Sequence, residues 1–442
     1  MTDTLDRQCI DTLRFLSVDM VQHVKKTKEA LGWSIEPPFL VPEAALAHFR
    51  EALGRGKTAE DDWNERIGAY AQGFPELAHE LQGQLREELP DGWDADVPVF
   101  AADAKGMATR VAGGKVMNAI APRLPALSGG SADLDPSTHT ALKGEGDFNS
   151  PLTPGEDDEG SDGGGWSHGG RNIHFGVREH AMGAIANGLA AHDGFIGYGS
   201  TFLIFSDYMR PPVRLAALMG IHVVHVFTHD SLALGEDGPT HQPVEQLANL
   251  RAIPRLTLIR PADANETAVA WRVALETRDR PVLLALTRQD VPTLDRSRYA
   301  SAEGVRRGAY VLADAEKTPP SLILMASGSE VGLIVAAAER LGAEGVAVRC
   351  VSMPSWELFE AQPKSYRDEV LPPQVTARLA IELGVRQGWD RYVGNRGDML
   401  GIDRFGASAP AQVLLERYGF TVENVVARAR ALLPRLGDPH DA

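Results

Sequence analysis

From Gly106 onward, short apolar runs alternate with helical segments, and this alternation limits the possible folds more than any other feature. Examples of the apolar runs are Ile196 to Tyr198, Val223 to Thr228, Leu256 to Arg260 and Pro281 to Thr287. Most of them are followed by a turn containing Gly, Pro or Asp and then by a helix. Strands that alternate with helices form a parallel sheet with helices on both faces. The sequence therefore predicts an α/β fold with doubly wound, mostly parallel sheets.

The alternation starts again near Gly308, which predicts a second α/β domain. Ser321 to Ala326 has the pattern of an apolar strand, Ser329 to Leu341 that of a helix, and Val346 to Ser352 that of the next strand. The segment between the two series, Thr293 to Arg306, is charged and irregular, as is typical of a linker.

The chain before Gly106 is predicted to be helical. Residues 4–22 carry apolar side chains at three- and four-residue steps, typical of an amphipathic helix whose apolar stripe needs a cover. Further helices are expected at Lys25 to Leu31, Glu43 to Leu53 and Asp61 to Gln84, the last interrupted near Pro75. This part carries no recognisable chemistry.

Charge and cysteine content restrict the partners and the compartment. The 60 acidic and 44 basic residues give a formal net charge of −16, which disfavours nucleic acid or an anionic membrane as the main partner. An anionic substrate would therefore need a local cationic pocket. The two cysteines, Cys9 and Cys350, are too few for a disulfide framework or a cysteine zinc site. Residues 1–22 also lack the apolar core of a signal peptide, so we expect a soluble, cytoplasmic protein.

Two polar segments stand out as candidate sites. In residues 171–188, the charged triplet Arg178 to His180 begins a helix of small residues. Taken alone, such a triplet ordinarily caps the helix and compensates its dipole. Residues 228–246 follow directly after an apolar strand, where α/β folds place their ligand crevice. Their His and carboxylate spacing makes a weak metal site but a strong polar substrate loop.

Two Gly-rich segments allow both a functional and a plain interpretation. Residues 129–137, GGSADLDPS, are preceded by the cations Arg110 and Lys115, and small residues there would let backbone N–H groups approach an anion. An ordinary turn is the alternative. Residues 144–170 are rich in Gly, Asp and Glu, which predicts a mobile surface loop. A metal-binding loop is the alternative, but the carboxylates do not fit EF-hand spacing.

Together, these segments resemble the transketolase family. The strings that follow that family's pattern in order, from about residue 97 to the end, are GGSADLDPS, GVREHAMGAIANG, STFLIFSDY, THDSLALGEDGPTHQPVEQLANLR, RPADANE, LTRQD, GSEV and GIDRFGASAP. The resemblance divides the chain into four parts: an N-terminal helix at 1–22, a helical remnant of the diphosphate-binding domain at 23–95, a pyrimidine-binding domain at 96–291 and a C-terminal domain at 307–442.

The resemblance implies a thiamine diphosphate enzyme that moves a two-carbon ketol group from a ketose phosphate to an aldose phosphate. Glu179 matches the catalytic glutamate that bonds the aminopyrimidine ring of the cofactor. The predicted cofactor-binding residues are Phe205 with Phe202 and Tyr208 beside it, and Asp133. Ordinary core packing is the alternative role for the three aromatic residues.

The same resemblance implies a substrate pocket. The residues that match sugar-hydroxyl ligands are His229, Asp237 and His241, and those that match phosphate ligands are Arg110, Ser137 and Arg288. Three such phosphate ligands would reconcile an acidic protein with an anionic substrate. We also expect the two histidines to have pKa values near neutral, which suits proton transfer to sugar oxygens.

One part of the family's pattern is missing. The family's first domain binds the cofactor diphosphate through Mg²⁺, with a GHPG segment and a GDG followed by an Asn, and neither string occurs here. We therefore assign no metal ligand. Losing three or four charge-assisted contacts removes roughly 5 to 10 kcal/mol of cofactor binding, or on the order of a thousandfold or more in affinity.

Transketolase sites lie between two subunits, so the resemblance suggests a homodimer or a heterodimer with a diphosphate-domain chain. Several alternatives remain open at the level of sequence. The chain would be a non-catalytic remnant if no partner completes it. A β-type subunit of a 2-oxoacid dehydrogenase and a deoxyxylulose phosphate synthase are disfavoured, because GEDGPTHQPVEQ is the sugar-phosphate version of the loop.

Overall fold

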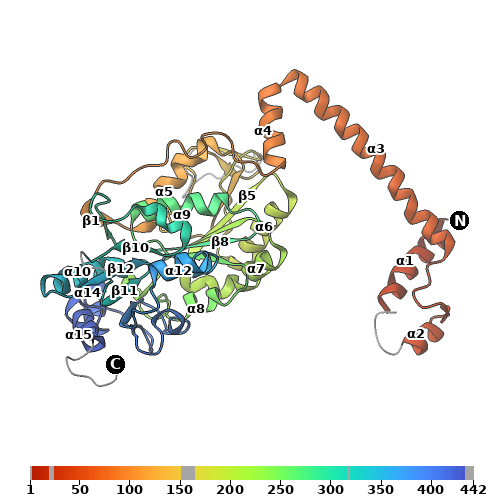
Figure 1. The fold of residues 1–442 in the computed structure, drawn as a ribbon. Coiled ribbons are helices and arrows are strands. Elements are labelled where there is room, and N and C mark those ends of the chain that lie inside the picture. The colour runs from red at the N-terminus through yellow and green to blue at the C-terminus, as the bar shows by residue number, and fades with distance from the viewer. Residues whose placement is uncertain (1, 19–23, 151–164, 316–318, 434–442) are drawn as a thin grey trace. The chain divides into compact units, whose positions relative to one another are not determined.

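The computed structural model of the chain describes residues 2–18, 24–150, 165–315 and 319–433 (Figure 1). The chain divides into two compact units, Met1–Gln82 and Gly83–Ala442. Each unit is described by itself below. Within the described ranges, no helix is both long enough and apolar enough to cross a membrane.

The smaller unit is helical, as predicted. Its helices are α1 (Thr2–Val18), α2 (Val24–Ala30), α3 (Glu43–Gly73) and the start of α4 (Pro75–Leu85). Cys9 on α1 is buried, whereas Leu13 remains 56% exposed, so the apolar stripe is only partly covered. The last residues of the predicted first helix, 19–22, lie outside the described residues.

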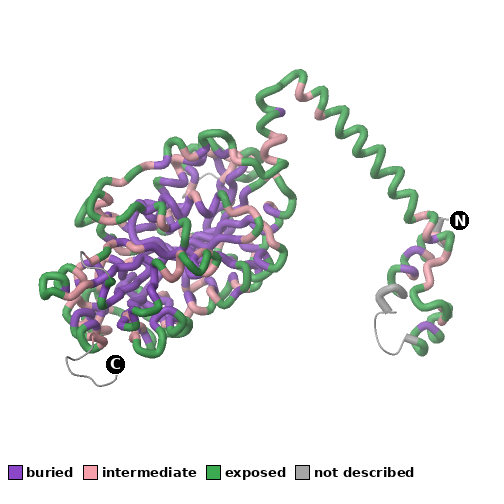
Figure 2. Tube along the Cα trace, in the orientation of Figure 1, coloured by how far each residue is buried: buried purple, intermediate pink, exposed green. Residues whose placement is uncertain are grey.

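The prediction of a break between Leu53 and Asp61 was wrong, because α3 is continuous through Gly54 and Gly56. A glycine inside a helix costs only about 1 kcal/mol, and the ion pair between Lys57 and Asp61, one turn apart at 2.7 Å, supports the helix there. The predicted interruption at Pro75 is confirmed by the boundary between α3 and α4. Figure 2 shows most of α3 as exposed.

The first half of the larger unit is built on a five-stranded, fully parallel sheet, which confirms the predicted fold class. Its strand order is β2-β5-β6-β8-β7. The strands are β2 (Leu127–Ser131), β5 (Ile196–Phe202), β6 (Val223–Thr228), β7 (Thr257–Ile259) and β8 (Val282–Leu286). All five are buried along their whole length, as expected of a sheet covered on both faces (Figure 2).

Helices cover both faces of this sheet. One face packs against α5 (Thr109–Ile120) and α9 (Ala264–Glu276) through Val226, Leu284 and Trp271. The opposite face packs against α6 (Glu179–His192), α7 (Ser206–Met219) and α8 (Gln246–Arg251). The side chain of Met182 lies against Gly199 and the backbone of Ala186 against Gly197, so α6 runs antiparallel to β5.

The second half of the larger unit holds another five-stranded sheet, ordered β10-β12-β11-β13-β14, in which only the edge strand β10 is antiparallel. Its strands are β10 (Tyr310–Ala313), β11 (Leu322–Ala326), β12 (Val348–Ser352), β13 (Arg378–Ile381) and β14 (Asp398–Leu400). Its helices are α10 (Glu330–Ala343), α11 (Trp356–Glu360), α12 (Lys364–Val370), α13 (Asp390–Val393), α14 (Ala411–Arg417) and α15 (Val422–Leu432). A continuous hydrophobic cluster contains residues of both halves, so the two α/β domains share a core.

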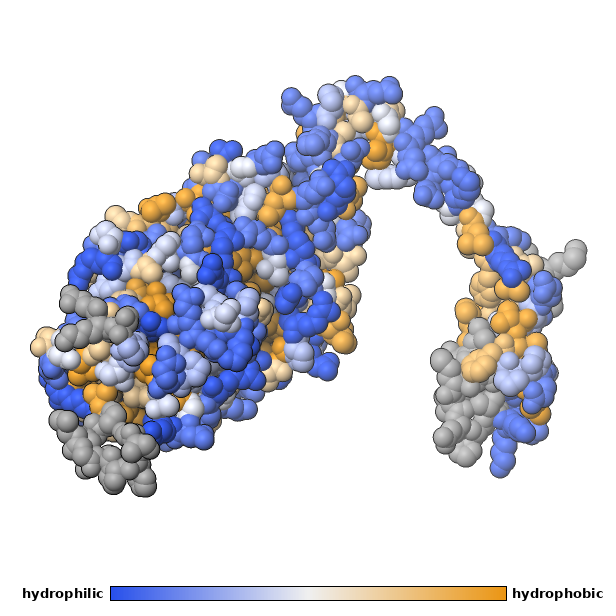
Figure 3. All heavy atoms as spheres, in the orientation of Figure 1, coloured by the Kyte–Doolittle hydropathy of each residue, from blue (hydrophilic) through white to orange (hydrophobic). Residues whose placement is uncertain are grey.

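Short elements complete the larger unit. The strands β1 (Asp103–Met107) and β9 (Val291–Thr293) pair antiparallel, and β3 (Asp147–Phe148) and β4 (Trp166–Ser167) pair parallel. Four 3₁₀ turns are described: η1 (Ala121–Arg123), η2 (Leu203–Phe205), η3 (Leu232–Leu234) and η4 (Ala302–Arg307). The expected irregular linker thus contains η4. Of the expected surface loop at 144–170, residues 151–164 lie outside the described part. The face seen in Figure 3 is largely hydrophilic over the larger unit.

Candidate functional site

The residues predicted for the site gather at one edge of the first sheet. Strands β2, β5, β6 and β8 are parallel, so the residues that follow them meet at their carboxyl edge, the usual ligand position in such folds. The predicted residues that follow these strands or end them are Asp133, Ser137, Phe202, Phe205, Tyr208, His229, Asp237, His241 and Arg288. Glu179 starts α6, whose antiparallel course brings its first turn to the same edge.

Arg110 is fixed at this edge by its neighbour Thr109. The backbone N–H of Thr109 donates to Thr287 Oγ1 at 2.9 Å, and the backbone N–H of Thr287 donates to Thr109 Oγ1 at 2.7 Å. Both threonines are fully buried. Since Thr287 precedes Arg288, this reciprocal pair holds the two arginines on adjacent elements. Sequence reasoning missed both threonines, although each stands next to a predicted arginine.

The two arginines lack a full complement of acidic partners. Arg110 Nη1 donates to the carbonyl oxygen of Ser137 at 2.5 Å, and Arg110 Nε is buried without a hydrogen-bond partner among the described residues. Burial and the nearby charge of Arg288 lower the pKa of Arg110, against the opposing effect of Asp290 and Asp237. Two cations held this close favour an anion between them.

His229 directly follows β6 in an unusual, left-handed conformation with φ of 58°. Its ring stacks on Phe202 with centroids 3.6 Å apart, and its Nδ1 pairs with Thr228 Oγ1 at 2.8 Å. Burial, with the charges of Arg110, Arg288 and His241, lowers the pKa of His229 to about 3. The expected near-neutral pKa was therefore wrong for His229, because that prediction ignored desolvation and the adjacent arginines. Without a bound anion, this side chain is a neutral hydrogen-bonding group.

Aromatic rings form a shelf beside His229. Phe202 and Phe205 are nearly parallel, at 11° and 5.8 Å between centroids, and Phe205 lies 6.0 Å from Tyr208. The ring of His241 meets the edge of this group, 5.5 Å from Phe205 at 74°. Phe202 is buried, Phe205 is half-buried and Tyr208 is 65% exposed. Part of the shelf is therefore accessible from outside the core. Such a surface suits a flat heteroaromatic ring.

Glu179 is a largely buried residue whose carboxylate has no partner among the described residues. It is 8% exposed and forms no hydrogen bond or ion pair with the described residues. The helix start shows no side-chain cap, and Arg178 donates instead to the carbonyl oxygen of Phe175 at 2.9 Å. The triplet therefore forms no side-chain cap, although Glu179 lies in the first turn of α6, where an acidic residue also complements the helix dipole. Buried polar groups normally have partners, so Glu179 is free to bond a ligand.

The remaining predicted residues are exposed at this edge. They are Asp133, Ser137 and Asp237, of which Asp133 has a left-handed φ of 62°. Across the described ranges, no group of three or more His, Cys, Asp or Glu could hold a metal ion. The residues present therefore fit the pyrimidine of the expected cofactor, but they do not fit its metal-bound diphosphate.

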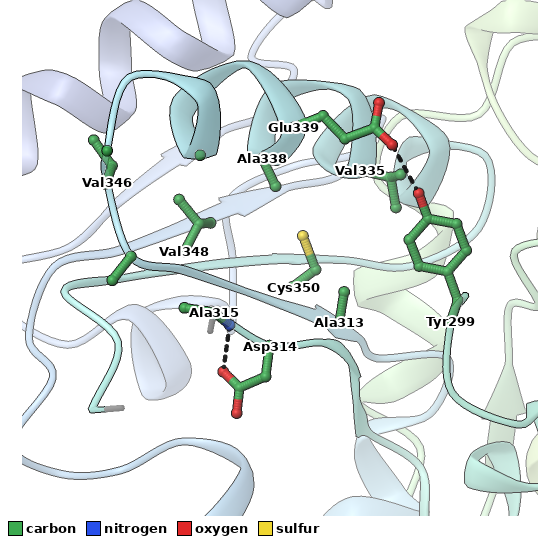
Figure 4. A pocket seen from close by; sticks show the side chains of 13 residues that line it. Tyr299, Ala313, Asp314, Ala315, Val335, Ala338, Glu339, Val346, Val348 and Cys350 are labelled. Carbon is green, nitrogen blue, oxygen red and sulfur yellow. Dashed lines mark hydrogen bonds between the residues drawn. The ribbon is translucent and has the colours of Figure 1, made fainter. Parts of the chain in front are cut away.

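A separate cavity of about 500 Å³ lies in the C-terminal sheet, between α10 and β12 (Figure 4). Apolar side chains such as Val335, Val348 and Cys350 line it, and burial raises the pKa of the Cys350 thiol to about 12. The two carboxylates at its rim are already paired, Asp314 with Arg349 and Glu339 with Arg298. This cavity contains no residue of the predicted site.

Comparison with known proteins identifies the family. The model for "Transketolase, pyrimidine binding domain" matches residues 105–293, and that for "Transketolase-like TK C-terminal domain" matches residues 308–421. A third, "Transketolase, thiamine diphosphate binding domain", matches residues 21–90. The chain belongs to the transketolase family. This confirms the resemblance, including the resemblance to a remnant of the diphosphate-binding domain. Members of the family use thiamine diphosphate and Mg²⁺.

Individual relatives agree with this assignment. The transketolase of Geobacillus stearothermophilus is 56% identical over 413 residues, covering 93% of this chain, and that of Bacillus subtilis is 48% identical over 410 residues, covering 92%. The chain spans about 59% of the length of these two relatives. Transketolase from Leishmania mexicana superimposes with a TM-score of 0.83 at 42% identity, covering 94% of this chain and 59% of its own.

Two further solved structures are informative. A Pichia stipitis transketolase in complex with sedoheptulose 7-phosphate matches with a TM-score of 0.84 at 40% identity, covering 92% of this chain and 57% of its own. A split-gene transketolase, described as an inactive β4 tetramer, matches with a TM-score of 0.55 at 25% identity. That match covers 74% of this chain and 98% of the split-gene chain.

Proposed function

We propose that this chain supplies the pyrimidine side and the sugar-phosphate pocket of a transketolase active site. The reaction is reversible transfer of a two-carbon ketol group from a ketose phosphate to an aldose phosphate. The observation that carries the proposal is the sheet edge at which an unpartnered carboxylate, an aromatic shelf and a pair of arginines meet. Each element of this edge suits a different part of the cofactor and substrate.

The side chains of this chain would act as follows. Thiamine diphosphate supplies the acyl-anion chemistry that no side chain provides. The Glu179 carboxyl group would hold a proton at the aminopyrimidine ring nitrogen. Because Glu179 is largely buried and has no competing partner among the described residues, its carboxyl group is available for this hydrogen bond. Phe205, with Phe202 and Tyr208, packs against the pyrimidine ring. Asp133 orders the cofactor side of the pocket.

The substrate side uses charge and hydrogen bonds. Arg110 and Arg288 bind the sugar phosphate together with Ser137, and Asp237 and His241 contact the hydroxyls. His229 is neutral when the pocket holds no anion, because burial and the two arginines lower its pKa to about 3. An incoming phosphate neutralises those arginines, so its binding raises the basicity of His229. The imidazole can then take a share of a proton from the sugar.

The diphosphate side would come from a second chain. Within the described residues, nothing groups as a metal site, and the chain spans about 59% of the length of its curated relatives. The split-gene transketolase offers a parallel, since its β chain is described as inactive when it forms a tetramer by itself. We therefore propose a cytoplasmic protein that dimerises, either with itself or with a chain that carries a diphosphate-binding domain. A non-catalytic remnant is the outcome if no such pairing occurs.

A 2-oxoacid dehydrogenase subunit is less well supported. A 2-oxoacid has a carboxylate but no distant phosphate, whereas the Arg110 and Arg288 pair forms an anion site separate from Glu179. Activity on 2-oxoacids without any response to sugar phosphates would favour that alternative.

A complementation assay tests the proposed function. The chain is mixed with a full-length transketolase whose own pyrimidine-side glutamate has been changed to glutamine. The only working pyrimidine side in the mixture then belongs to this chain. We expect ketol transfer to appear with the unmodified chain and not with a Glu179→Gln chain. Mixed dimers that remain inactive with the unmodified chain, or a failure to form mixed dimers, would refute the proposal.

A further inference from the structure

The segment that carries His229, Asp237 and His241, which we name the sugar loop (residues 229–244), is held by the C-terminal domain. We propose that the C-terminal domain acts as a clamp that sets the geometry of this loop. Two positioning residues connect the loop to the clamp: Arg260, which follows β7 of the first sheet, and Gln242, which lies in the loop itself. The consequence for sugar binding rests on the proposed function, whereas the clamp itself does not. None of the predicted substrate ligands comes from the C-terminal domain, so its contribution would be indirect.

The first contact is at the start of the loop. Arg260 is fully buried, and its Nε donates to Asp230 Oδ2 at 2.8 Å. The same guanidinium donates through Nη1 to the carbonyl oxygen of Ser327 at 3.0 Å and pairs with Glu330 at 2.9 Å. Both of these partners belong to the C-terminal domain. Because Asp230 directly follows His229, this ion network fixes the residue next to the left-handed turn.

The second contact is at the middle of the loop. Gln242 is 1% exposed, and its Nε2 donates to the carbonyl oxygens of Gly235, in the loop, at 2.8 Å and of Ala407, in the C-terminal domain, at 3.0 Å. Ser408 Oγ also donates to the carbonyl oxygen of Glu236. These bonds flank Asp237 and His241 on either side. The tip of the loop is therefore tied to residues 407–408 of the C-terminal domain.

The third contact is at the end of the loop. The backbone N–H of Val385 donates to the carbonyl oxygen of Val244 at 3.1 Å. Just beyond, Arg251 and Glu382 form a nearly buried bidentate ion pair, at 2.7 and 2.8 Å, between the two domains. The loop is thus attached to the C-terminal domain directly at its middle and end, and through Arg260 at its start.

Such attachment has a predictable effect on binding. Fixing a flexible backbone costs about 1–2 kcal/mol per residue, and a loop that is already fixed does not incur this cost when the ligand binds. The clamp therefore favours sugar affinity without touching the sugar. A role limited to domain packing would instead affect stability and leave the loop and its ligand unchanged.

Gly406 offers a perturbation that lies outside the predicted site. A Cβ placed on Gly406 would lie 1.7 Å from Gln242 Oε1, so Gly406→Ala must displace the Gln242 side chain. The matched control is Gly342→Ala in α10, where an added Cβ meets nothing within 4 Å. Both are glycine-to-alanine changes in the C-terminal domain, but only the first pushes on the loop.

The full-length chain and both variants are compared by three measurements. They are amide hydrogen exchange over residues 235–242, calorimetric titration with ribose 5-phosphate, and titration with inorganic phosphate. We expect Gly406→Ala to speed exchange in the loop and to weaken ribose 5-phosphate binding about tenfold, since misplaced ligands cost that much or more. The affinity of Gly406→Ala for inorganic phosphate should equal that of the unmodified chain, because Arg110 and Arg288 lie outside the loop. Gly342→Ala should match the unmodified chain in all three.

A double-mutant cycle tests whether Gly406→Ala acts on the loop through Gln242. If Gly406→Ala acts through Gln242, then in a Gln242→Ala background it should add nothing further to loop exchange. Unchanged exchange in Gly406→Ala, or an equal effect with and without Gln242, would overturn the clamp. An unmodified chain that does not bind ribose 5-phosphate would instead count against the proposed function, while the exchange comparison would still decide on the clamp.

Discussion

His225 gives the larger unit a measurable sensitivity to acid. The side chain lies in the middle of β6, is 0% exposed, and neither ring nitrogen has a hydrogen-bond partner among the described residues. Burial lowers the pKa of His225 to about 3 in the folded chain. In the unfolded chain the ordinary value is about 6.5. Between these two pH values, His225 is protonated in the unfolded chain but not in the folded chain. The free energy of unfolding therefore decreases as the pH falls from about 6.5 toward 3.

The size of this effect follows from the two pKa values. From pH 7 to pH 5, one such histidine lowers the free energy of unfolding by about 2 kcal/mol. His225→Leu should remove that loss. Other groups also titrate in this range, including His222, whose pKa burial lowers to about 4. Their contributions cancel when the variant is compared with the unmodified chain, so the difference between the two chains isolates His225.

Urea unfolding of both chains at pH 7 and pH 5 measures this difference. We expect the unmodified chain to lose about 2 kcal/mol more than His225→Leu between the two pH values. His192→Gln, a change at an exposed histidine of the same domain, is the control and should behave like the unmodified chain. Equal losses in the unmodified chain and His225→Leu would refute the reasoning, because the folded chain would then accept the proton at His225.

Three further predictions follow from the site. Glu179→Gln should abolish ketol transfer in the complementation assay without lowering the thermal midpoint, since it removes an unpartnered buried charge; retained transfer would exclude Glu179 from catalysis. Thr287→Val should weaken inorganic phosphate binding about tenfold, because it removes the hydroxyl that bonds Thr109 and so loosens the relative position of the two arginines. Thr287→Ser keeps the hydroxyl and should preserve the phosphate affinity; titration calorimetry measures both. Arg260→Met should destabilise the chain by about 3–5 kcal/mol in urea unfolding, because Asp230 and Glu330 would be left buried without their cation; a loss below about 1 kcal/mol would contradict this.

The fold could be predicted from local patterns. Apolar runs such as Val223 to Thr228 are each followed by a turn and a helix. This pattern predicted strands that are buried on both faces of the sheet. The continuity of α3 through Gly54 and Gly56 could not be predicted, because glycine weakens a helix without ending it. The antiparallel edge strand β10 was also not anticipated, since its pairing with β12 depends on tertiary contacts.

The predicted site residues gather at one sheet edge, but their environments could not be predicted. The motif around His229 indicated a polar loop, yet the low pKa of His229 arises first from burial and then from the charge of Arg110, about 120 residues earlier. Thr109 and Thr287 form their reciprocal pair across 178 residues of sequence, so no local pattern reveals it. The roles assigned to individual residues remain predictions for the experiments above.

The pairing of opposite charges separates this site from the ion networks of the core. At the domain boundary, the Arg251–Glu382 pair is bidentate, and Trp389 Nε1 also donates to Glu382 at 2.8 Å. At the sheet edge, by contrast, neither Glu179 nor Arg110 forms an ion pair with the described residues, and Arg110 donates there only to a carbonyl oxygen, that of Ser137. A largely buried charge without a counter-charge is costly, so a fold optimised only for stability would have paired or replaced both residues. The two residues differ in charge, which is the pattern expected when one edge binds a heteroaromatic base and an anion together.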